Sequence, residues 1–227
     1  MPPLNHLIDH TLLAPTATEA DIVRLCDEAR THDFYAVCVN SVWVATAVEA
    51  LEGSSVRVAS VVGFPLGAQL MLAKATETRL AQMSGALELD VVIALGLLLE
   101  GNYTYVYDDL AMAVWAAHEK GDSGVIVKAI LETAALTDKQ IVRACKLARK
   151  AGADFVKTST GFLDPKLALP GRPTGATVEA VKLMRKTVGD ALGVKASGGI
   201  STREQAEALV EAGATRLGTS HSLDLIS

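Results

Sequence analysis

Short apolar segments alternate with amphipathic segments along the whole chain. Eight of the apolar segments have the length and the Val, Ile and Leu content of β-strands, and several are continuous apolar runs, as expected for parallel strands covered on both faces. The predicted strands are 6–13, 36–39, 57–62, 87–93, 125–131, 155–158, 193–196 and 216–219.

The segments between these strands predict helices with recognisable ends. Residues 137–140 and 201–204 both have the spacing of a capping box, in which a hydroxyl and a Glu or Gln three residues later satisfy the first free backbone amides. Gly152 and Gly213 follow these two helices, and glycine readily takes the left-handed conformation that ends a helix. Residues 16–19 open another predicted helix, and 69–84 and 104–120 complete the set.

The alternation of strands and helices predicts an α/β fold, a single-domain (β/α)8 TIM barrel over residues 1–227. The main alternative is an open, doubly wound sheet, but the first βα turn lacks G-x-G-x-x-G and the chain has no Walker A sequence. No linker divides the chain. Residues 161–175, with three prolines, predict one long loop, and loops of that length are usually functional or mobile.

Composition and charge narrow the functional classes. Half of the residues are hydrophobic and the formal charge is −5, so the chain lacks the basic excess of a nucleic-acid-binding protein. The longest apolar run, 91–99, is far shorter than the roughly twenty residues of a membrane span, and indicates a buried strand and its loop. Three widely spaced cysteines and an N-terminus without a signal-peptide pattern predict a cytoplasmic location.

Three lysines lie inside apolar strand segments, namely Lys128, Lys157 and Lys195. Lysine is rarely buried without a partner, although one at a strand end can reach solvent while its stem is packed. Three such lysines, two of them beside turns rich in Ser, Thr and Gly, favour a functional site. A neutral amine attacks carbonyl carbons, and a second cation nearby together with burial lowers a lysine pKa toward about 7–8. The pattern therefore predicts Schiff-base chemistry.

Other residues extend this candidate site. Asp90 lies in another buried strand, where it could pair with a lysine, transfer protons, or do both. Gly198 and Gly199 follow the seventh predicted strand and Ser220 follows the eighth, where barrels often bind phosphate.

Cys38 is interpreted as a small buried apolar residue that could also face the barrel mouth. His6 and His10 are four residues apart, but no further ligands support a metal site.

Six segments of the chain resemble the 2-deoxyribose-5-phosphate aldolase family. They are IDHTLL (8–13), VVGFPLG (61–67), VKAILET (127–133), ADFVKTSTG (153–161), VKASGGI (194–200) and RLGTS (216–220), and they occur in order through the chain. The resemblance implies a class I aldolase on a (β/α)8 barrel. Such an enzyme interconverts 2-deoxy-D-ribose 5-phosphate with acetaldehyde and D-glyceraldehyde 3-phosphate, without a metal or another cofactor.

The resemblance also implies roles for individual residues. Lys157 corresponds to the Schiff-base lysine, Lys195 to the neighbour that lowers its pKa, and Asp90 to the proton-relay carboxylate. The implied substrate-binding residues are Asp9, Thr11 and Thr160, and the implied phosphate-binding residues are Gly161, Gly198, Gly199 and Ser220. Lys128 and Cys38, from the predicted strands, are two further expected substrate-binding residues. The expected partners are small aldehydes and sugar phosphates, with no nucleic acid and no membrane, and the family allows a homodimer.

Two alternatives remain open from the sequence. Ala14, Ala94 and Leu98 stand where the family usually has polar or basic residues, and the loop 161–175 is longer than expected. The chain could therefore be a related lysine aldolase for a different or non-phosphorylated aldehyde. It could also be a barrel that binds sugar phosphates with low catalytic activity.

Overall fold

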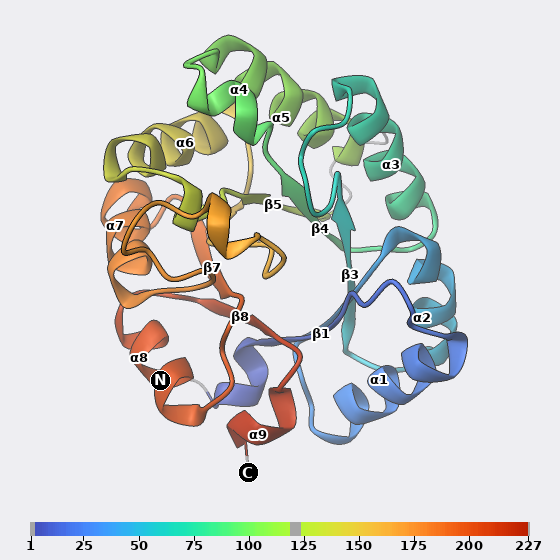
Figure 1. The fold of residues 1–227 in the computed structure, drawn as a ribbon. Coiled ribbons are helices and arrows are strands. Elements are labelled where there is room, and N and C mark those ends of the chain that lie inside the picture. Colours follow the sequence, from blue (N-terminus) through green and yellow to red (C-terminus); the bar gives the residue numbers. More distant parts are fainter. Residues whose placement is uncertain (1–2, 119–123, 227) are drawn as a thin grey trace.

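Eight parallel strands close into a barrel in the computed structural model, which describes residues 3–118 and 124–226 (Figure 1). Each strand pairs with the next along the chain, and the first pairs with the last through Ile8 and Leu217. The strands are β1 (Ile8–Leu12), β2 (Ala36–Val39), β3 (Arg57–Val62), β4 (Glu88–Val92), β5 (Ile126–Ile130), β6 (Phe155–Lys157), β7 (Gly193–Ser197) and β8 (Arg216–Thr219).

Helices surround the barrel on the outside, as the view along its axis shows (Figure 1). The α-helices are α1 (Glu19–Thr31), α2 (Val44–Ala50), α3 (Met71–Met83), α4 (Leu95–Leu99), α5 (Tyr103–His118), α6 (Asp138–Ala151), α7 (Val178–Val188), α8 (Arg203–Glu211) and α9 (Ser222–Ile226). Short 3-10 helices lie at η1 (Leu4–Leu7), η2 (Ser41–Trp43), η3 (Thr133–Ala135) and η4 (Pro165–Leu167).

The predicted (β/α)8 barrel is confirmed, and the bounds of three strands, β2, β3 and β8, agree with the sequence prediction. The first strand starts two residues later than predicted, because η1 occupies the chain up to Leu7. The capping box at Thr137 and the left-handed Gly152 are both present. The predicted helix 104–120 corresponds to α5, and residues 119 and 120 lie outside the described residues.

Two local predictions are wrong. The capping box of α8 uses Thr202 and Gln205, one residue later than predicted, and Gln205 also accepts a hydrogen bond from the backbone N–H of Ser201. The adjacent frame also has a hydroxyl and a long polar side chain, so spacing alone did not decide between the two. The apolar run after β4 is not a loop, because Leu95–Leu99 forms α4, which buries Leu98.

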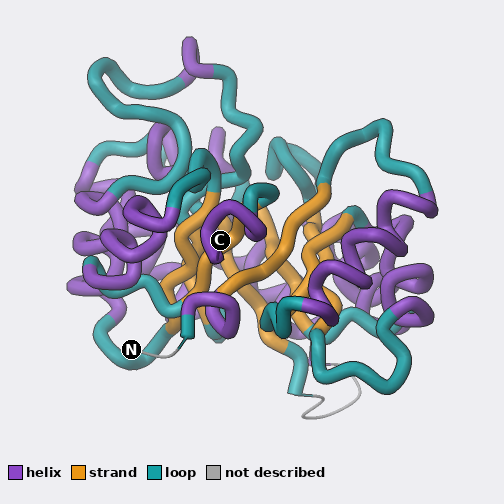
Figure 2. The backbone as a smooth tube through the Cα atoms, turned by 90° about the horizontal axis from the view of Figure 1, so that it is seen from below, coloured by secondary structure: helices purple, strands orange, loops and turns teal. Residues whose placement is uncertain are grey.

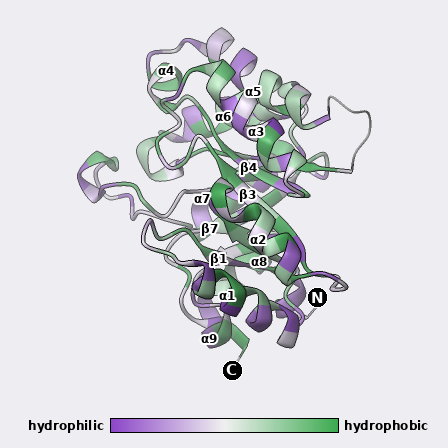
Figure 3. Cartoon of the chain, turned by 90° about the vertical axis from the view of Figure 1, so that its right-hand side faces the viewer, coloured by the Kyte–Doolittle hydropathy of each residue, from purple (hydrophilic) through white to green (hydrophobic). Residues whose placement is uncertain are grey.

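Most of the hydrophobic core lies between the barrel and its helices. Side chains from the outer faces of the strands pack there against the buried faces of the helices, and green, hydrophobic ribbon follows the strands in Figure 3. A separate small apolar cluster consists of Leu13, Cys38, Ala59 and Val61, with Phe64 packed against it. Among the described helices, none has the length and apolar character to cross a membrane.

The loop 161–175 extends beyond the carboxyl end of the barrel (Figures 1 and 2). Its far side is attached to the neighbouring βα unit, because the backbone N–H of Leu169 donates to the carbonyl of Ala134 at 2.9 Å and Arg172 pairs with Asp138. Its near side begins directly after β6. The predicted loop therefore borders the end of the barrel at which TIM-barrel sites are found.

Candidate active site

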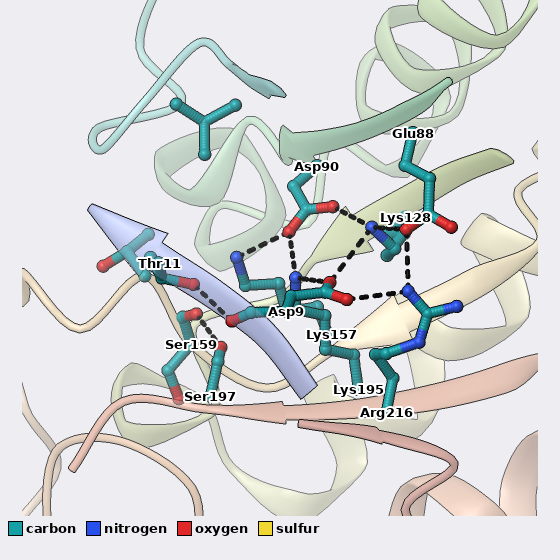
Figure 4. A network of polar contacts seen from close by, with 12 residues as sticks. Asp9, Thr11, Glu88, Asp90, Lys128, Lys157, Ser159, Lys195, Ser197 and Arg216 are labelled. Carbon is teal, nitrogen blue, oxygen red and sulfur yellow. Dashed lines mark hydrogen bonds and ion pairs between the residues drawn. The ribbon is translucent and has the colours of Figure 1, made fainter. Parts of the chain in front are cut away.

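Three lysines converge on one carboxylate inside the barrel (Figure 4). The Nζ atoms of Lys157 and Lys195 both lie 2.8 Å from Oδ2 of Asp90, and the Nζ of Lys128 lies 2.6 Å from its Oδ1. All four side chains are buried. The two lysines of the sequence hypothesis are therefore brought to the same oxygen atom.

Strand register explains why these side chains meet. Asp90 of β4 is paired with Lys128 of β5, and Lys157 of β6 is paired with Lys195 of β7. Alternate residues of a barrel strand point inward, so residues in register on neighbouring strands reach the interior at similar heights. Gly218 of β8 leaves room for this arrangement, because a Cβ there would lie 2.8 Å from Cε of Lys195.

Further charges surround this cluster deeper in the barrel. Asp9 accepts from Lys195 and, at 2.8 Å, from Nη1 of Arg216, which also lies 2.8 Å from Oε2 of Glu88. Glu88 in turn pairs with Lys128 at 2.7 Å. Sequence reasoning missed Glu88 and Arg216. Both occupy predicted strands at alternate positions, Glu88 two residues before Asp90 and Arg216 two before Gly218, and that spacing was the available signal.

Charge balance within this network favours one neutral lysine. Three buried carboxylates, on Asp9, Glu88 and Asp90, face four buried basic side chains. Arg57, 3.7 Å from Glu88, is partly exposed to solvent. Loss of one proton leaves three positive and three negative charges, which suits a buried site where an uncompensated charge is costly. Burial lowers the pKa of Lys157, and the charge of Lys195 lowers it further, against the opposing effect of Asp90.

The neighbouring lysine behaves in the opposite way. Burial lowers the pKa of Lys195, but Asp9 and Asp90 together outweigh burial, so the pKa lies above its usual value. Burial alone would raise the pKa of Asp90, yet Lys128, Lys157 and Lys195 hold it well below its usual range. Lys195 thus remains a cation and Asp90 an anion, while Lys157 is the lysine of this pair whose pKa is lowered.

A cavity of about 610 Å³ opens at the carboxyl end of the barrel, and Lys157 lies on its wall. The wall combines the ends of β1, β6, β7 and β8 with the loops that follow them. Seven residues of the sequence hypothesis line it: Thr11, Lys157, Thr160, Gly161, Gly198, Gly199 and Ser220. Lys157 is the point at which the buried charge network meets this cavity.

Glycines allow three chain segments to approach one another at this wall. Gly198 and Gly199 have φ angles of 86° and 73°, in the region that favours glycine. A Cβ on Gly198 would lie 3.0 Å from Cα of Gly175 and 3.2 Å from Cα of Gly161. A Cβ on Gly175 would lie 2.4 Å from the carbonyl oxygen of Gly198, so the end of the long loop is pressed against the turn after β7.

Five residues of the sequence hypothesis are not on the cavity wall. Asp9, Asp90 and Lys195 lie behind Lys157 in the charge network, and Lys128 is fully buried among Glu88, Asp90 and Asp9. Cys38 is also fully buried, and burial raises the pKa of its thiol above the usual value. The structure does not bring Lys128 or Cys38 to the cavity.

Sequence reasoning also missed Glu132, which lies just beyond β5. It is 3% exposed and has a φ of 59°, a left-handed conformation that is costly for a residue other than glycine. Its Oε2 accepts hydrogen bonds from the hydroxyl and, at 3.1 Å, the backbone N–H of Thr160, which lines the cavity. Burial raises the pKa of Glu132 against the opposing hydrogen bonds from Thr160. Glu132 thus holds Thr160, and with it the chain that follows Lys157 and β6, through two hydrogen bonds.

The two N-terminal histidines have separate partners. Nε2 of His6 lies 2.7 Å from Asp33 at the surface, and His10 is buried between Ser222 and Glu28, at 2.8 Å from each. Each ring is oriented by its own neighbours, so their spacing in the sequence does not correspond to a shared site. Among the described residues, no group of three or more His, Cys, Asp or Glu side chains could hold a metal ion.

Comparison with known proteins gives consistent matches over nearly the whole chain. Residues 5–221 match the model of the DeoC/LacD family aldolases. A deoxyribose-phosphate aldolase of Thermococcus gammatolerans is 52% identical over 221 residues, which cover 96% of this chain and 93% of that protein. One of Clostridium botulinum is 49% identical over 223 residues, covering 98% and 99%.

Solved structures of similar proteins have the same fold as this chain. A putative deoxyribose-phosphate aldolase from Coccidioides immitis superposes with a TM-score of 0.89 at 40% identity, covering 98% of this chain and 84% of that one. The deoxyribose phosphate aldolase from Aeropyrum pernix, described as a unique tetramer, gives a TM-score of 0.87 at 34% identity, covering 98% and 89%.

Proposed function

Because this chain belongs to the DeoC/LacD aldolase family, we propose that it is a class I aldolase that reversibly cleaves 2-deoxy-D-ribose 5-phosphate. The products are acetaldehyde and D-glyceraldehyde 3-phosphate, and the reaction proceeds through a Schiff base on Lys157. The observation that carries this proposal is the position of Lys157, which lines the cavity and whose amine lies against Asp90, next to Lys195.

The reaction begins with the neutral amine of Lys157. Its nitrogen attacks the aldehyde carbon, C1, of the open-chain sugar to form a carbinolamine, which loses water to give a protonated imine. The bond between C2 and C3 then breaks, and its electron pair moves toward the iminium nitrogen to leave an enamine. The C3 hydroxyl loses its proton and becomes the aldehyde of glyceraldehyde 3-phosphate. Protonation of the enamine at C2 and hydrolysis of the imine release acetaldehyde and restore the amine.

Asp90 and Lys195 have complementary roles in these steps. Asp90 carries protons to and from the reacting atoms, directly or through water, because it lies against the reactive amine. The neighbouring lysines hold the pKa of Asp90 low, so it is ionised in the free enzyme and can accept a proton. Lys195 keeps its charge and so favours the neutral form of Lys157. Asp9 and Lys128 hold Lys195 and Asp90 in place through the ion pairs described above.

The cavity wall supplies the contacts to the rest of the sugar. Thr11 and Thr160 bind substrate hydroxyls, and the glycine turns at Gly161, Gly198 and Gly199 with Ser220 surround the phosphate. Backbone N–H groups in such turns can approach an anion closely because glycine has no side chain. Asp9 acts on the substrate through ordered water or through Lys195, since it lies behind the wall.

The same proposal covers the location, the partners and the assembly of the protein. Residues 1–227 act as one aldolase domain in the cytoplasm, in keeping with three buried cysteines that form no disulfide. The partners are small aldehydes and sugar phosphates. Assembly is proposed as a homodimer, and gel filtration with light scattering of the purified chain tests this directly.

Reductive trapping tests the Schiff base. Acetaldehyde and borohydride are added to the protein, and peptide mass mapping is expected to find the ethyl label on Lys157. Lys157→Ala should lose the label, whereas the control Lys74→Met, which removes an equally buried lysine outside the barrel interior, should keep it. Labelling of a different lysine, or none, contradicts the proposal. Equal kcat/KM for deoxyribose 5-phosphate and deoxyribose would instead favour a non-phosphorylated substrate.

A further inference from the structure

Glu132 is a buried carboxylate that takes no part in the ion pairs of the charge network. It lies two residues beyond the end of β5, on the side of the barrel where the cavity opens. Its Oε2 is bonded to Thr160, and its Oε1 is buried without a hydrogen-bond partner in the part of the chain that the structure describes. Costly left-handed backbone of this kind is concentrated at functional sites, so the placement of Glu132 indicates a role there.

The backbone around Glu132 turns its side chain toward Thr160. The N–H groups of the residues before and after Glu132 donate to the carbonyls of Lys157 and Thr158, at 2.9 Å each. These two carbonyls belong to adjacent residues, whereas a regular parallel ladder would use carbonyls two residues apart. The ladder therefore slips by one residue at Glu132, as it does at a β-bulge, and such slips re-aim a side chain beside a site.

The hydrogen bonds of the Thr160 hydroxyl leave it one way to bind a ligand. A hydroxyl has one proton and two lone pairs. The proton of Thr160 is donated to Oε2 of Glu132, and one lone pair accepts the backbone N–H of Phe162 at 3.0 Å. Thr160 is 7% exposed and lines the cavity, so its second lone pair is what it offers there. A ligand can bond to this hydroxyl only as a donor.

Glu132 keeps this arrangement in both of its ionisation states. Oε2 accepts the backbone N–H of Thr160 at 3.1 Å as well as the hydroxyl, so a proton on Oε2 would oppose both donors. Burial raises the pKa of Glu132, against the hydrogen bonds from Thr160 and the charge of Lys157. When the carboxyl group is protonated, its proton therefore resides on Oε1, and Oε2 remains an acceptor.

Other hydroxyls on the cavity wall are held in the same sense. Three of them donate to backbone carbonyls, namely those of Thr11, Ser197 and Thr219. Their protons are thus engaged within the protein, and they too present lone pairs to a ligand. Of these four hydroxyls, that of Thr160 alone donates to a side chain. Its orientation can therefore be released by a substitution at Glu132, which itself does not line the cavity.

A hydroxyl that offers only a lone pair suits a substrate hydroxyl that keeps its proton. During cleavage the C3 oxygen of deoxyribose 5-phosphate loses its proton and becomes the carbonyl oxygen of glyceraldehyde 3-phosphate, which cannot donate a hydrogen bond. The C4 hydroxyl keeps its proton throughout and becomes the C2 hydroxyl of glyceraldehyde 3-phosphate. Thr160 therefore matches the C4 hydroxyl in the substrate, the transition state and the product alike.

We propose that Glu132 is a positioning residue that acts through Thr160: it fixes the Thr160 hydroxyl as the acceptor for the C4 hydroxyl of the substrate. In the synthetic direction it thereby sets a preference for aldehydes with a hydroxyl on the carbon next to the carbonyl group. A site built to pair with a hydroxyl disfavours an analogue that lacks it, because the polar groups of the site are then left unpaired. The proposal rests on the proposed function, since it concerns a hydroxyl of the same substrate.

The test measures kcat and KM for two phosphorylated aldehydes, each combined with acetaldehyde in the synthetic direction. D-Glyceraldehyde 3-phosphate carries the hydroxyl, and 3-oxopropyl phosphate has the same chain and phosphate without it. In Glu132→Leu the ratio of the two kcat/KM values should fall about tenfold from the wild-type ratio. The loss should appear as a higher KM for D-glyceraldehyde 3-phosphate, because the hydrogen bond is made equally in the ground state and the transition state.

Two comparisons separate this role from a loosened fold. Glu132→Gln should keep the wild-type ratio within about threefold, because the amide oxygen can replace Oε2 as the acceptor. Thr160→Val should itself lower the ratio about tenfold, and adding Glu132→Leu to it should change the ratio by less than about twofold. Each ratio is measured on one preparation of one protein, so it does not depend on the fraction of that protein that is folded.

Ser159→Ala is the matched control. Ser159 is buried next to Thr160, and its hydroxyl has no hydrogen-bond partner within residues 3–118 and 124–226, so the wild-type ratio should be kept. An unchanged ratio in Glu132→Leu overturns the proposal, and so does a loss confined to kcat. A further tenfold loss in the double variant also overturns it, as does a Glu132→Gln ratio as low as that of Glu132→Leu.

A binding measurement keeps this inference separate from the proposed function. The glycerol phosphate obtained by reducing D-glyceraldehyde 3-phosphate and 3-hydroxypropyl phosphate both lack a carbonyl group, and they differ in the same hydroxyl. Calorimetric titration of the wild type should show about tenfold tighter binding of the glycerol phosphate, and Glu132→Leu should bind the two about equally. That result supports the role of Glu132 even if neither aldehyde reacts, which would count against the proposed function alone. The same affinity ratio in both proteins overturns the inference even if both aldehydes react.

Discussion

Replacement of Lys195 by methionine should raise the pKa of Lys157 and move catalysis to higher pH. Methionine keeps most of the volume of the side chain but removes the charge. The amine of Lys157 then loses the nearby cation that disfavours its protonation, while Asp90 remains 2.8 Å away and favours it. Both effects act in the same direction.

The size of the shift follows from the geometry. The two amine nitrogens each lie 2.8 Å from the same oxygen of Asp90. They are therefore no more than about 5.6 Å apart, and at an effective dielectric constant of about 20 their repulsion is about 3 kcal/mol or more. A repulsion of that size changes the protonation equilibrium of Lys157 about 100-fold, so its neutral fraction at pH 7 should fall by about that factor.

The assay is the pH dependence of kcat/KM for cleavage of deoxyribose 5-phosphate. In Lys195→Met the rising limb of the profile should move up by about two pH units, with about 100-fold lower activity at pH 7 and partial recovery above pH 9. Lys74→Met, which changes a buried lysine between α3 and α5, should leave the limb in place. A Lys195→Met profile with the wild-type limb would refute the electrostatic reasoning.

Three further predictions concern the buried charges. Asp90→Asn should lower the free energy of unfolding by about 3–5 kcal/mol in urea titrations, because three lysines lose their shared carboxylate. Because cations lower the folded-state pKa of Asp90 and Asp9, the stability these groups add is complete above about pH 4 and lost below it, and the urea midpoint should fall accordingly. Lys74→Met should cost about 3 kcal/mol of unfolding free energy by leaving Asp109 buried and unpaired, and adding Asp109→Leu should restore most of it.

The alternation of apolar runs and capped helices was enough to predict the barrel. Parallel strands covered on both faces leave a strong signal, so eight strands were placed with small errors at their ends. The errors occurred where two local solutions compete. Thr202 and Ser201 both offer a hydroxyl at a suitable spacing for α8, and the apolar run after Val92 has the composition of either a loop or a short buried helix.

The site was predictable where a charged residue interrupts an apolar strand. Lys157, Lys195 and Asp90 have this signature, and the structure brings them together. Glu88 and Arg216 lie at strand ends and look like ordinary surface charges in a linear sequence. The alternate spacing within each strand indicates an inward position, but the partners that allow these charges to be buried depend on register across the barrel, between strands that are far apart in the sequence.

Lys128 and Glu132 show a second limit of sequence reasoning. Lys128 has the same signature as Lys157, but it lies two residues earlier relative to the barrel end: it is in register with Phe155, whereas Lys157 is in register with Ile130. That difference places it beneath the cavity. Glu132 follows its strand in a left-handed conformation that its residue type disfavours, so its contact with Thr160 could be found only in three dimensions.

The pKa of Lys157 tests the central claim most directly. Lysines labelled with 13C at Cε report their ionisation by NMR, and comparison with Lys157→Met assigns the signal of this residue. The account predicts that Lys157 titrates below the ordinary lysine value of about 10.4, while Lys195 still carries its proton at that pH. A Lys157 amine that titrates at or above the ordinary value would contradict the account.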